Sequence, residues 1–577
     1  MSNNRIIGEF FSAVEPTESE KEKLAAHFEN KLNNPVSIKW VKDENVKKGF
    51  VLKILNKVYD DTPDGLLRGL KSTVDEIDKN KSDYISLVKE SVDKWKPRAA
   101  AEEVGSVLSV ADGVAKVGGL HGVRYGEIIT FENGGKGLAL DLSESETGCI
   151  LFDDEDIVAG DNAYKTGKTA GVPVSDEIIG RVVNALGEPV DGKGAFAADK
   201  YMPVERPAPA IIDRSPVNQP LKTGILSVDS MFPIGKGQRE LIIGDRQTGK
   251  TSIAVDTILN QKGKNVICIY CAVGQKASTV KRLVKTLEDN GALDYTVTVL
   301  SSASDSAPLQ YIAPFSACAI AEYFMYGGKD VLIVYDDLSK HAVAYRTISL
   351  LLGRSPGREA YPGDIFYLHS RLLERSARLS EEKGGGSITA LPIIETLGGD
   401  ISAYIPTNVI SITDGQLFLE SELFLSGLRP AVNVGLSVSR VGGSAQTKAM
   451  KKAVGSLRLE LAQYREMKTF ARFSGDLDES IKEQFAFGKA LTEILVQPLG
   501  KPYEEWEEIV ILVVSLAKIT IDLDVKKIRP FFESFSVFFK ENHADVISDI
   551  ENVKTLSDDD KNIIIAAAKK FLNENHV

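Results

Sequence analysis

The stretch Gly244-Asp-Arg-Gln-Thr-Gly-Lys-Thr251 is the strongest indication of fold in this 577-residue chain. It fits the pattern G-x-x-x-x-G-K-[ST] of a phosphate-binding loop. A short apolar run, Arg239–Ile243, precedes the loop, and Ser252–Leu259 after it has the apolar spacing of a helix. The motif therefore lies between a predicted strand and a predicted helix, where backbone N–H groups and the positive helix end can hold phosphate oxygens.

The loop and a second motif together predict a site for a nucleotide with Mg²⁺. Lys250 would reach the β- and γ-phosphates, and the Thr251 hydroxyl would bind Mg²⁺. The run Val331–Asp337 is an apolar strand that ends in acids, and we expect Asp336 to hold Mg²⁺ through water. The predicted nucleotide ligands in the loop are Gly244, Asp245, Arg246, Gln247, Thr248, Gly249, Lys250 and Thr251.

Composition narrows the class of protein. The formal net charge is −12 and the sequence pI is about 5.3, which argues against nonspecific binding to nucleic acid. Cys268 and Cys271 form a C-x-x-C, but residues three apart on a predicted strand point to opposite faces, which argues against a metal or redox site. No signal peptide is visible, and the apolar run Ile509–Ala517 is far shorter than the ~20 residues that span a bilayer. We therefore expect a cytosolic chain, or one that is peripheral on a membrane through its partners.

The first hundred residues are predicted to form a separate module and a linker. Residues 1–75 contain a predicted helix, two strands and a second helix, which indicates a small α+β module. These elements are Glu18–Lys31, Val36–Val41, Gly49–Leu55 and Asp64–Val74. Residues 76–101 are predicted to be a linker helix that ends at Lys96-Pro97, since the residue before proline avoids the helical region.

The remaining chain is predicted to contain three further domains. Residues 102–168 are short strands with glycine turns and a hairpin signal at Asp112-Gly113, which indicates a β-barrel. Residues 169–447 alternate strands and helices, typical of an α/β P-loop (RecA-like) nucleotide-binding domain with a mostly parallel sheet. Residues 448–577 have helical patterning, with breaks expected at Pro498, Pro502 and Pro530, and indicate a C-terminal α-helical bundle.

Four longer stretches resemble the α subunit of F-type rotary ATP synthases and ATPases. They are Val228–Thr251, Tyr335–Arg346, Pro356–Asp364 and Pro430–Arg440, and the resemblance extends from about Ser82 to the C-terminus. It implies an alternating hexamer with β subunits around a central γ shaft, joined to membrane rotor and stator sectors. It also implies Mg-ATP or Mg-ADP as ligands, ion-coupled ATP synthesis or hydrolysis, and a place on the cytoplasmic face of a bacterial inner membrane.

Gln275 indicates that the chain is the non-catalytic, regulatory subunit type. Hydrolysis needs a carboxylate that positions and polarises the attacking water. In the β subunits of this family a glutamate follows the strand after the P-loop helix, and here Gln275 stands at that position. We therefore expect Gln275 to contact the nucleotide site without acting as a base, so that the site turns over slowly or not at all.

The resemblance assigns the catalytic contribution of this chain to Arg440. In α subunits the arginine of this motif reaches the neighbouring β site and stabilises charge on the transferring phosphoryl group. Arginine suits that role because it is always charged and presents a planar fork. Ser437, with Ser439 and Ser411, is expected to support the same interface.

The resemblance also places an adenine pocket for the chain's own nucleotide. Arg429, Pro430 and Gln497 match it, together with Gln247 in the loop. The family pattern has a second glutamine two residues after the first, and here Leu499 stands there. This departure puts the adenine affinity of the site in question.

The N-terminal segment resembles part of the δ subunit of the same enzymes. Gly49–Asp60 followed by Leu66–Leu70 carries the resemblance, although Lys48 stands where a second glycine is usual. It implies contact with δ or the peripheral stalk; an unrelated docking module is the alternative. For the whole chain, the alternatives are a self-sufficient hexameric secretion or export ATPase, or a structural paralogue in a motility or scaffold complex.

Overall fold

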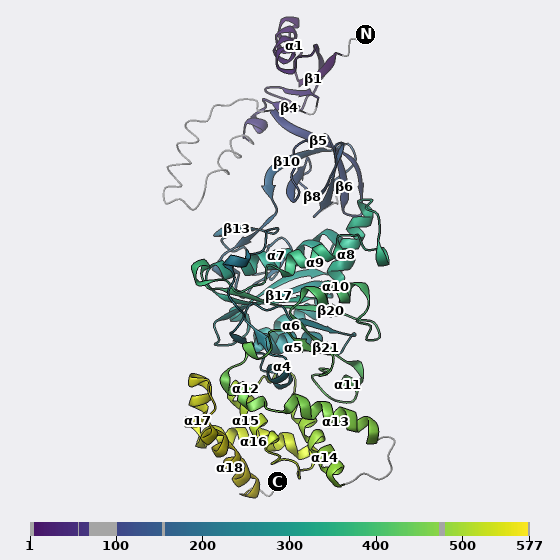
Figure 1. Ribbon diagram of the computed structural model, residues 1–577. Helices are drawn as coiled ribbons and strands as arrows, with labels where there is room; N and C mark the ends of the chain where they lie inside the picture. Colours follow the sequence, from purple (N-terminus) through teal and green to yellow (C-terminus); the bar gives the residue numbers. More distant parts are fainter. Residues whose placement is uncertain (1–4, 56, 68–100, 153–155, 472–478, 575–577) are drawn as a thin grey trace. The chain divides into compact units, whose positions relative to one another are not determined.

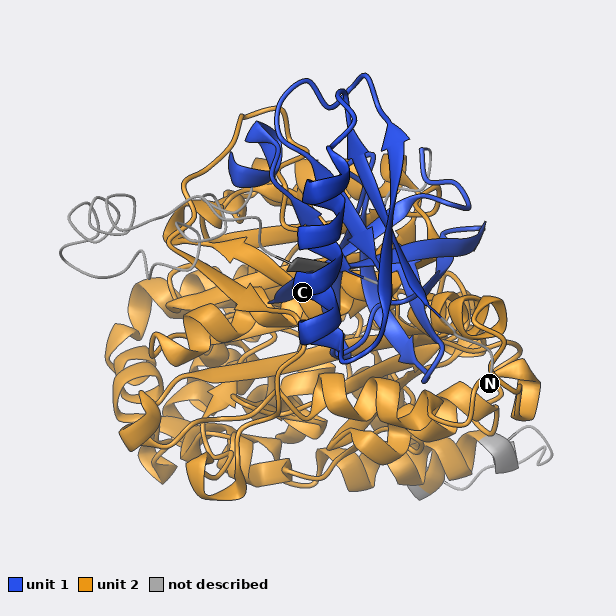
Figure 2. Cartoon of the chain, turned by 90° about the horizontal axis from the view of Figure 1, so that it is seen from above, with its two compact units in different colours: residues 1–170 blue, residues 171–577 orange. Residues whose placement is uncertain are grey.

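The computed structural model describes residues 5–55, 57–67, 101–152, 156–471 and 479–574. Figure 1 shows these elements along the chain. They divide into two compact units, residues 1–170 and residues 171–577, which Figure 2 colours separately. Each unit is described by itself. Among the described residues, no helix combines the length and the apolar composition that a membrane crossing requires.

The N-terminal module is a small sheet with one helix against it. Its helix α1 (Glu18–Leu32) starts at a capping box, in which Thr17 and Glu20 satisfy each other's backbone N–H groups. The core between sheet and helix consists of Phe10, Phe28, Val36, Leu52 and Ile54. The strands are β1 (Ile6–Ser12), β2 (Val36–Lys42), β3 (Val51–Ile54) and β4 (Lys57–Asp60).

The prediction of an α+β module is confirmed, but β1 and β4 were not predicted. β1 carries apolar residues on both faces, with Ile7 and Phe11 opposite to Phe10, so the alternation that marks a half-buried strand is weak. β4 has four residues, near the lower limit of strand length. Of the predicted helix Asp64–Val74 the structure describes a helical turn at residues 63–67. The rest of that helix, and the predicted linker helix up to residue 100, lie outside the described residues.

Six strands after the module close into the predicted barrel. They run in the order β5-β6-β9-β8-β7-β10, and β10 pairs back with β5. The predicted hairpin at Asp112-Gly113 is present, and both residues have the positive φ that a two-residue turn of this kind requires. The strands are β5 (Ala101–Ala111), β6 (Val114–Gly118), β7 (Glu127–Phe131), β8 (Lys136–Leu142), β9 (Glu146–Leu151) and β10 (Asn162–Thr169).

The module and the barrel share one sheet. β4 pairs antiparallel with β5, with Lys57 opposite Glu103 and Tyr59 opposite Ala101, and this continues the barrel strands into β4-β3-β1-β2. The N-terminal module is therefore joined to the barrel by backbone hydrogen bonds as well as by the chain.

An eight-stranded sheet forms the middle of the second unit, in the order β12-β18-β17-β19-β20-β16-β21-β22. All neighbours are parallel except the edge strand β22, so the prediction of a mostly parallel sheet is confirmed. The strands are β12 (Val182–Asn184), β16 (Leu241–Gly244), β17 (Val266–Gln275), β18 (Thr296–Ser302), β19 (Asp330–Asp336), β20 (Ser387–Glu395), β21 (Gly415–Leu419) and β22 (Val438–Ser439). Two short ribbons, β11 (Gly171–Val174) with β13 (Lys200–Pro203) and β14 (Pro220–Leu221) with β15 (Ile234–Gly235), accompany this sheet.

Helices cover both faces of this sheet, as Figure 1 shows. α5 and α6 follow β16 and β17 on one face, whereas α7, α8 and α9 lie on the other. This change of side follows from the right-handed crossover rule, because the chain reverses its direction across the sheet after β18. The helices are α4 (Leu226–Met231), α5 (Lys250–Leu259), α6 (Ala277–Asp289), α7 (Ala307–Tyr326), α8 (Leu338–Leu351), α9 (Ile365–Leu373), α10 (Tyr404–Ile412) and α11 (Ser421–Leu425).

The C-terminal helices share one hydrophobic core with the nucleotide-binding sheet. α15 is buried along most of its length, and α16 packs Phe531, Phe535 and Phe539 inward. The expected break at Pro530 is wrong, because α16 continues through it: one missing N–H is tolerated where three phenylalanines hold the helix in the core. The helices are α12 (Lys448–Val454), α13 (Leu457–Ala471), α14 (Glu479–Ile494), α15 (Glu505–Leu516), α16 (Val525–Asn542), α17 (Ala544–Ser548) and α18 (Asp558–Glu574).

Candidate functional site

The phosphate-binding loop connects the carboxyl end of β16 to the first turn of α5. Gly249 is the N-cap of α5 with a φ of 95°, and no side chain caps the helix there. Gln247 also has a positive φ, of 62°. The first N–H groups of α5 are thus left for an external acceptor, which is the arrangement that binds phosphate.

Lys250 lies folded against the loop. Its ammonium donates hydrogen bonds to the carbonyl oxygens of Gly244, at 2.7 Å, and of Asp245. Burial lowers the pKa of Lys250 below its ordinary value, although the carboxylates of Glu395, Asp337 and others act in the opposite direction. These carboxylates favour the charged form of Lys250, which is the form that binds an anionic ligand.

Asp336 brings the loop and the strand β19 together. Its Oδ2 accepts hydrogen bonds from the Thr251 hydroxyl at 2.7 Å and the Tyr270 hydroxyl at 2.6 Å, and its Oδ1 accepts one from Gln275 Nε2 at 3.1 Å. The hydroxyl and the carboxylate are oxygen donors of the kind that Mg²⁺ prefers, and Mg²⁺ takes its other ligands from phosphate and water. Thr251, Asp336 and Gln275, expected near one another from the sequence, therefore do meet.

Gln275 offers this cluster an amide in place of a carboxylate. Gln275 is the last residue of β17, and its Nε2 donates a hydrogen bond to Asp336. The neighbouring acid, Asp337, caps α8 by accepting from the Lys340 N–H, and burial raises its pKa to about 6. Asp337 is thus occupied as a helix cap, and Gln275 cannot accept a proton from water.

Glu395 and Tyr270 lie beside the loop but were not predicted as site residues, whereas Asp245 was. Asp245 accepts hydrogen bonds from Thr396 (2.7 Å), the Gly399 N–H (2.8 Å) and Ser421 (3.0 Å), so this predicted ligand also fixes the loop to the segment after β20 and to the start of α11. Glu395, the last residue of β20, forms an ion pair with Arg246 of the loop. Glu395 and Tyr270 are the residues that sequence reasoning missed here, since neither belongs to a local motif.

A cavity of about 460 Å³ adjoins the phosphate-binding loop at Thr248 and Gly249. The Arg429 guanidinium lies over the Phe424 ring, 4.4 Å from its centroid, and the peptide bond before Pro430 is cis. Phe424, on α11, was also not predicted. The lining includes Thr248, Gly249, Ser252, Asp256, Phe424, Arg429, Pro430, Gln497 and Leu499. An aromatic ring and an arginine beside a phosphate loop suit a stacked base.

Gln497 borders this cavity, and its side-chain amide is hydrogen-bonded to the backbone. Its Oε1 accepts from the Leu226 N–H at 3.1 Å, and its Nε2 donates to the carbonyls of Gly224 at 2.7 Å and Lys501 at 2.9 Å. The amide is therefore committed to three backbone groups and borders the cavity as a structural residue. Leu499, on the same lining, is 68% exposed and has no polar group to offer a base.

Arg440 extends from a firmly held segment at the edge of the sheet. Its backbone N–H donates to the Asp414 carbonyl at 2.8 Å. Among the residues that the structure describes, its exposed side chain makes no hydrogen bond or ion pair. The arginine thus combines a fixed backbone with an unpartnered guanidinium.

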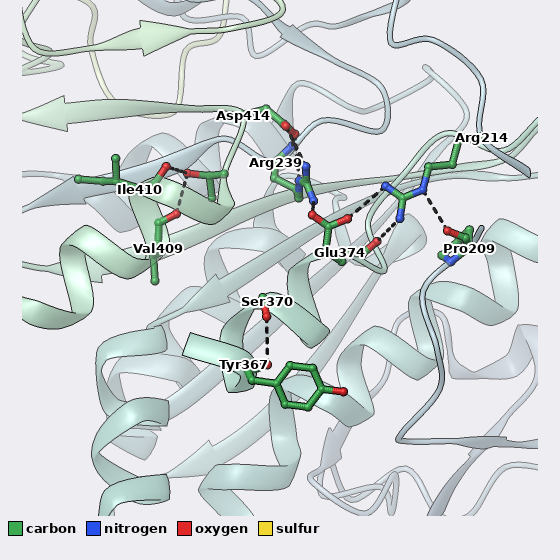
Figure 3. A network of polar contacts seen from close by, with 10 residues as sticks. Pro209, Arg214, Arg239, Tyr367, Ser370, Glu374, Val409, Ile410 and Asp414 are labelled. Atoms are coloured by element: carbon green, nitrogen blue, oxygen red, sulfur yellow. Dashed lines mark hydrogen bonds and ion pairs between the residues drawn. The ribbon is translucent and has the colours of Figure 1, made fainter. Parts of the chain in front are cut away.

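Figure 3 shows what holds Asp414 itself in place. Its carboxylate accepts hydrogen bonds from the Arg239 N–H at 3.0 Å, Nε at 3.0 Å and Nη2 at 2.9 Å, and Arg239 also pairs with Glu374. Glu374 accepts in turn from Arg214, which donates as well to the Pro209 carbonyl at 3.1 Å. Through Asp414, the backbone of Arg440 is in this way tied to Arg239, just before the strand β16 that leads into the phosphate loop.

The three serines expected beside Arg440 are placed differently from one another. Ser437 is fully buried, and its hydroxyl accepts from the Phe418 N–H at 3.0 Å. Ser439 donates to the Pro233 carbonyl at 2.9 Å, whereas the exposed Ser411 only bonds within α10, to Thr407. Ser437 and Ser439 therefore support the segment from within the chain.

Four family models match successive parts of this chain. Residues 224–439 match the ATP synthase alpha/beta family nucleotide-binding domain, residues 446–571 its C-terminal domain, and residues 101–167 its beta-barrel domain. Residues 1–74 match the ATP synthase delta (OSCP) subunit.

Individual curated proteins give the same assignment. The ATP synthase subunit alpha of Acetivibrio thermocellus is 56% identical over 491 residues, which are 85% of this chain and 97% of that protein. The subunit of the same name from Clostridium acetobutylicum is 57% identical over 490 residues, 85% of this chain and 96% of that protein. In both cases the similar region covers almost the full relative and leaves part of this chain over.

Proposed function

The chain belongs to the ATP synthase alpha/beta family, as an alpha subunit of F-type ATP synthase with an N-terminal delta (OSCP) domain, and we propose that it is a non-catalytic nucleotide-binding subunit. In this proposal it holds Mg-ATP or Mg-ADP at its own phosphate loop without rapid turnover. It also supplies Arg440 to the catalytic site of an adjacent beta subunit.

The nucleotide proposal rests on the hydrogen bonds that Thr251 and Gln275 donate to Asp336 beside the phosphate-binding loop. Loop N–H groups and Lys250 would take the phosphates, Thr251 and Asp336 would hold Mg²⁺, and the base would stack near Phe424 and Arg429. When bound, Mg²⁺ neutralises phosphate charge. Gln275 can orient a water molecule but cannot remove its proton, which supports a site that retains nucleotide.

The proposal for Arg440 rests on its exposed side chain and its fixed backbone. Its guanidinium has no partner among the residues that the structure describes, and such a group is available to a phosphate on another chain. Its place near the edge strand β22 suits contact with a neighbouring subunit. Ser437 and Ser439 would act by fixing the segment.

Isolated full-length chain should bind Mg-nucleotide but should not turn it over. We expect about one Mg-ATP per chain in equilibrium dialysis and no ATP hydrolysis above background until a beta-type partner is added. Lys250→Ala should weaken binding at least about tenfold, because it removes charge-assisted hydrogen bonds. Brisk ATP turnover by the chain alone would contradict the proposal and favour a self-sufficient ATPase of the export type.

The delta (OSCP) domain implies contacts with the stalk of the enzyme, and we propose that residues 1–60 form a stalk-facing module on each alpha subunit. The pairing of β4 with β5 supports this, because force on the module would pass directly into the barrel strands. The proposed setting is a complex on the cytoplasmic face of a bacterial inner membrane that couples ATP synthesis or hydrolysis to ion movement, with beta and gamma partners and the membrane sector.

Removal of residues 1–60 should separate catalysis from coupling. In membrane vesicles we expect ion-driven ATP synthesis to fall to background, since the stator contact is lost. ATP hydrolysis by the detached alpha–beta complex should remain unchanged, because the phosphate loop and Arg440 lie in the other unit. The measurement is both rates on the same preparation, and intact coupling after the deletion would exclude a stalk role.

A further inference from the structure

Glu395 lies between the two strands that carry the nucleotide motifs. It ends β20, which pairs with β19 on one side and β16 on the other. The parallel register places Glu395 opposite Gly244, the first residue of the phosphate loop. A carboxylate therefore stands at the carboxyl edge of the sheet, next to the loop and beside the strand of Asp336.

Hydrogen bonds fix the backbone around Glu395, whereas the side chain of its ion-pair partner, Arg246, is not fixed. The Glu395 N–H donates to the Ser339 hydroxyl at 2.9 Å, and the next residue, Thr396, donates to Asp245 at 2.7 Å. The Glu395 side chain is 15% exposed. The Arg246 side chain is 77% exposed, so it is free to turn from Glu395 toward another anion.

The charge of Glu395 acts where the terminal phosphate is expected. Glu395 is opposite Gly244 in the register of β20 and β16, and the Lys250 ammonium donates to the Gly244 carbonyl at 2.7 Å. A γ-phosphate held by Lys250 would therefore lie close to the negatively charged Glu395 carboxylate. Such like charges repel, and the repulsion is stronger in a partly buried site than in water.

We propose that Glu395 and Arg246 set the preference of this site between nucleoside triphosphates and nucleoside diphosphates. Glu395 disfavours the additional charge of a γ-phosphate. Arg246 offsets that repulsion, because its guanidinium can face the carboxylate and the phosphate together. This inference rests on the proposed nucleotide site and adds which phosphate chain the site retains.

The test is calorimetric titration of the full-length chain with Mg-ATP and, separately, with Mg-ADP. Glu395→Gln should raise the affinity for ATP about tenfold relative to ADP, and Arg246→Gln should lower it about tenfold relative to ADP. The double variant should return the ratio of the two affinities to near that of the wild type. Glu288→Gln, an exposed carboxylate on α6, is the matched control and should leave the ratio unchanged.

The outcomes separate this inference from the proposed function. Should the wild-type chain bind neither nucleotide, the proposed nucleotide site itself is wrong. Should both nucleotides bind and each variant change their affinities by equal factors, Glu395 and Arg246 only support the loop and the inference is overturned. Opposite shifts of the ATP-to-ADP ratio in the two single variants would establish it.

Discussion

Replacing Arg440 by alanine should reduce ATP turnover of the assembled complex by about 10³-fold or more, the range found for arginines that stabilise phosphoryl transfer. The expected cause is the loss of a planar, permanent positive charge beside the transferring phosphoryl group. Arg440→Lys should recover only part of the rate, because an ammonium keeps the charge but loses the bidentate fork. Steady-state ATP hydrolysis by the purified complex measures both variants.

Two controls locate the effect of Arg440 in the neighbouring subunit. Nucleotide bound at the Lys250 site should be unchanged in Arg440→Ala, since Arg440 does not line the cavity beside the loop. Arg282→Ala, an exposed arginine on α6, should leave turnover at the wild-type rate. A complex with Arg440→Ala that hydrolyses ATP within tenfold of the wild type would remove the finger from the proposed mechanism.

Local patterns predicted the elements that carry the phosphate site. The strand before Gly244, the helix after Lys250 and the acid at the end of β19 follow from apolar periodicity and a short motif, both of which are read within a few residues. The four-part architecture followed in the same way. The adjacency of Thr251 and Asp336 followed from the geometry of parallel strands, whose carboxyl ends meet at one edge, whereas the family resemblance assigned Gln275 to the same site.

Contacts between distant residues could not be read from these patterns. Arg246 and Glu395 are 149 residues apart, and Glu395 belongs to no motif. The amide of Gln497 hydrogen-bonds to Leu226 and Gly224, more than 270 residues away. Such pairs depend on which strands and loops the complete fold brings together, and apolar spacing carries no information about them.

The strand pairing between the N-terminal module and the barrel is a backbone contact that local sequence patterns likewise could not predict. β4 is too short for its own sequence to specify it, and its pairing with β5 joins segments on either side of residues 68–100. Strand pairing is made by backbone N–H and C=O groups, which every sequence has. The residue types therefore say little about which strands pair or in which register.

The ion pair between Arg375 and Glu322 is fully buried, and breaking it should be costly. Arg375 Nε and Nη2 each donate to Glu322 at 2.8 Å, and Nη1 donates to the Val204 carbonyl at 2.7 Å. The side chains are 1% and 0% exposed. Arg375→Met should therefore lower stability by about 3–5 kcal/mol, because it leaves a buried carboxylate without its counter-charge. The urea midpoint of unfolding at pH 8 measures this loss.

A paired variant separates the effect of the buried charge from the effect of lost packing. The double variant Glu322→Leu/Arg375→Met removes both charges and should recover most of the lost stability at pH 8, as replaced buried pairs often do. If the double variant were as unstable as Arg375→Met alone, packing and the Val204 contact would account for the loss instead of the uncompensated carboxylate.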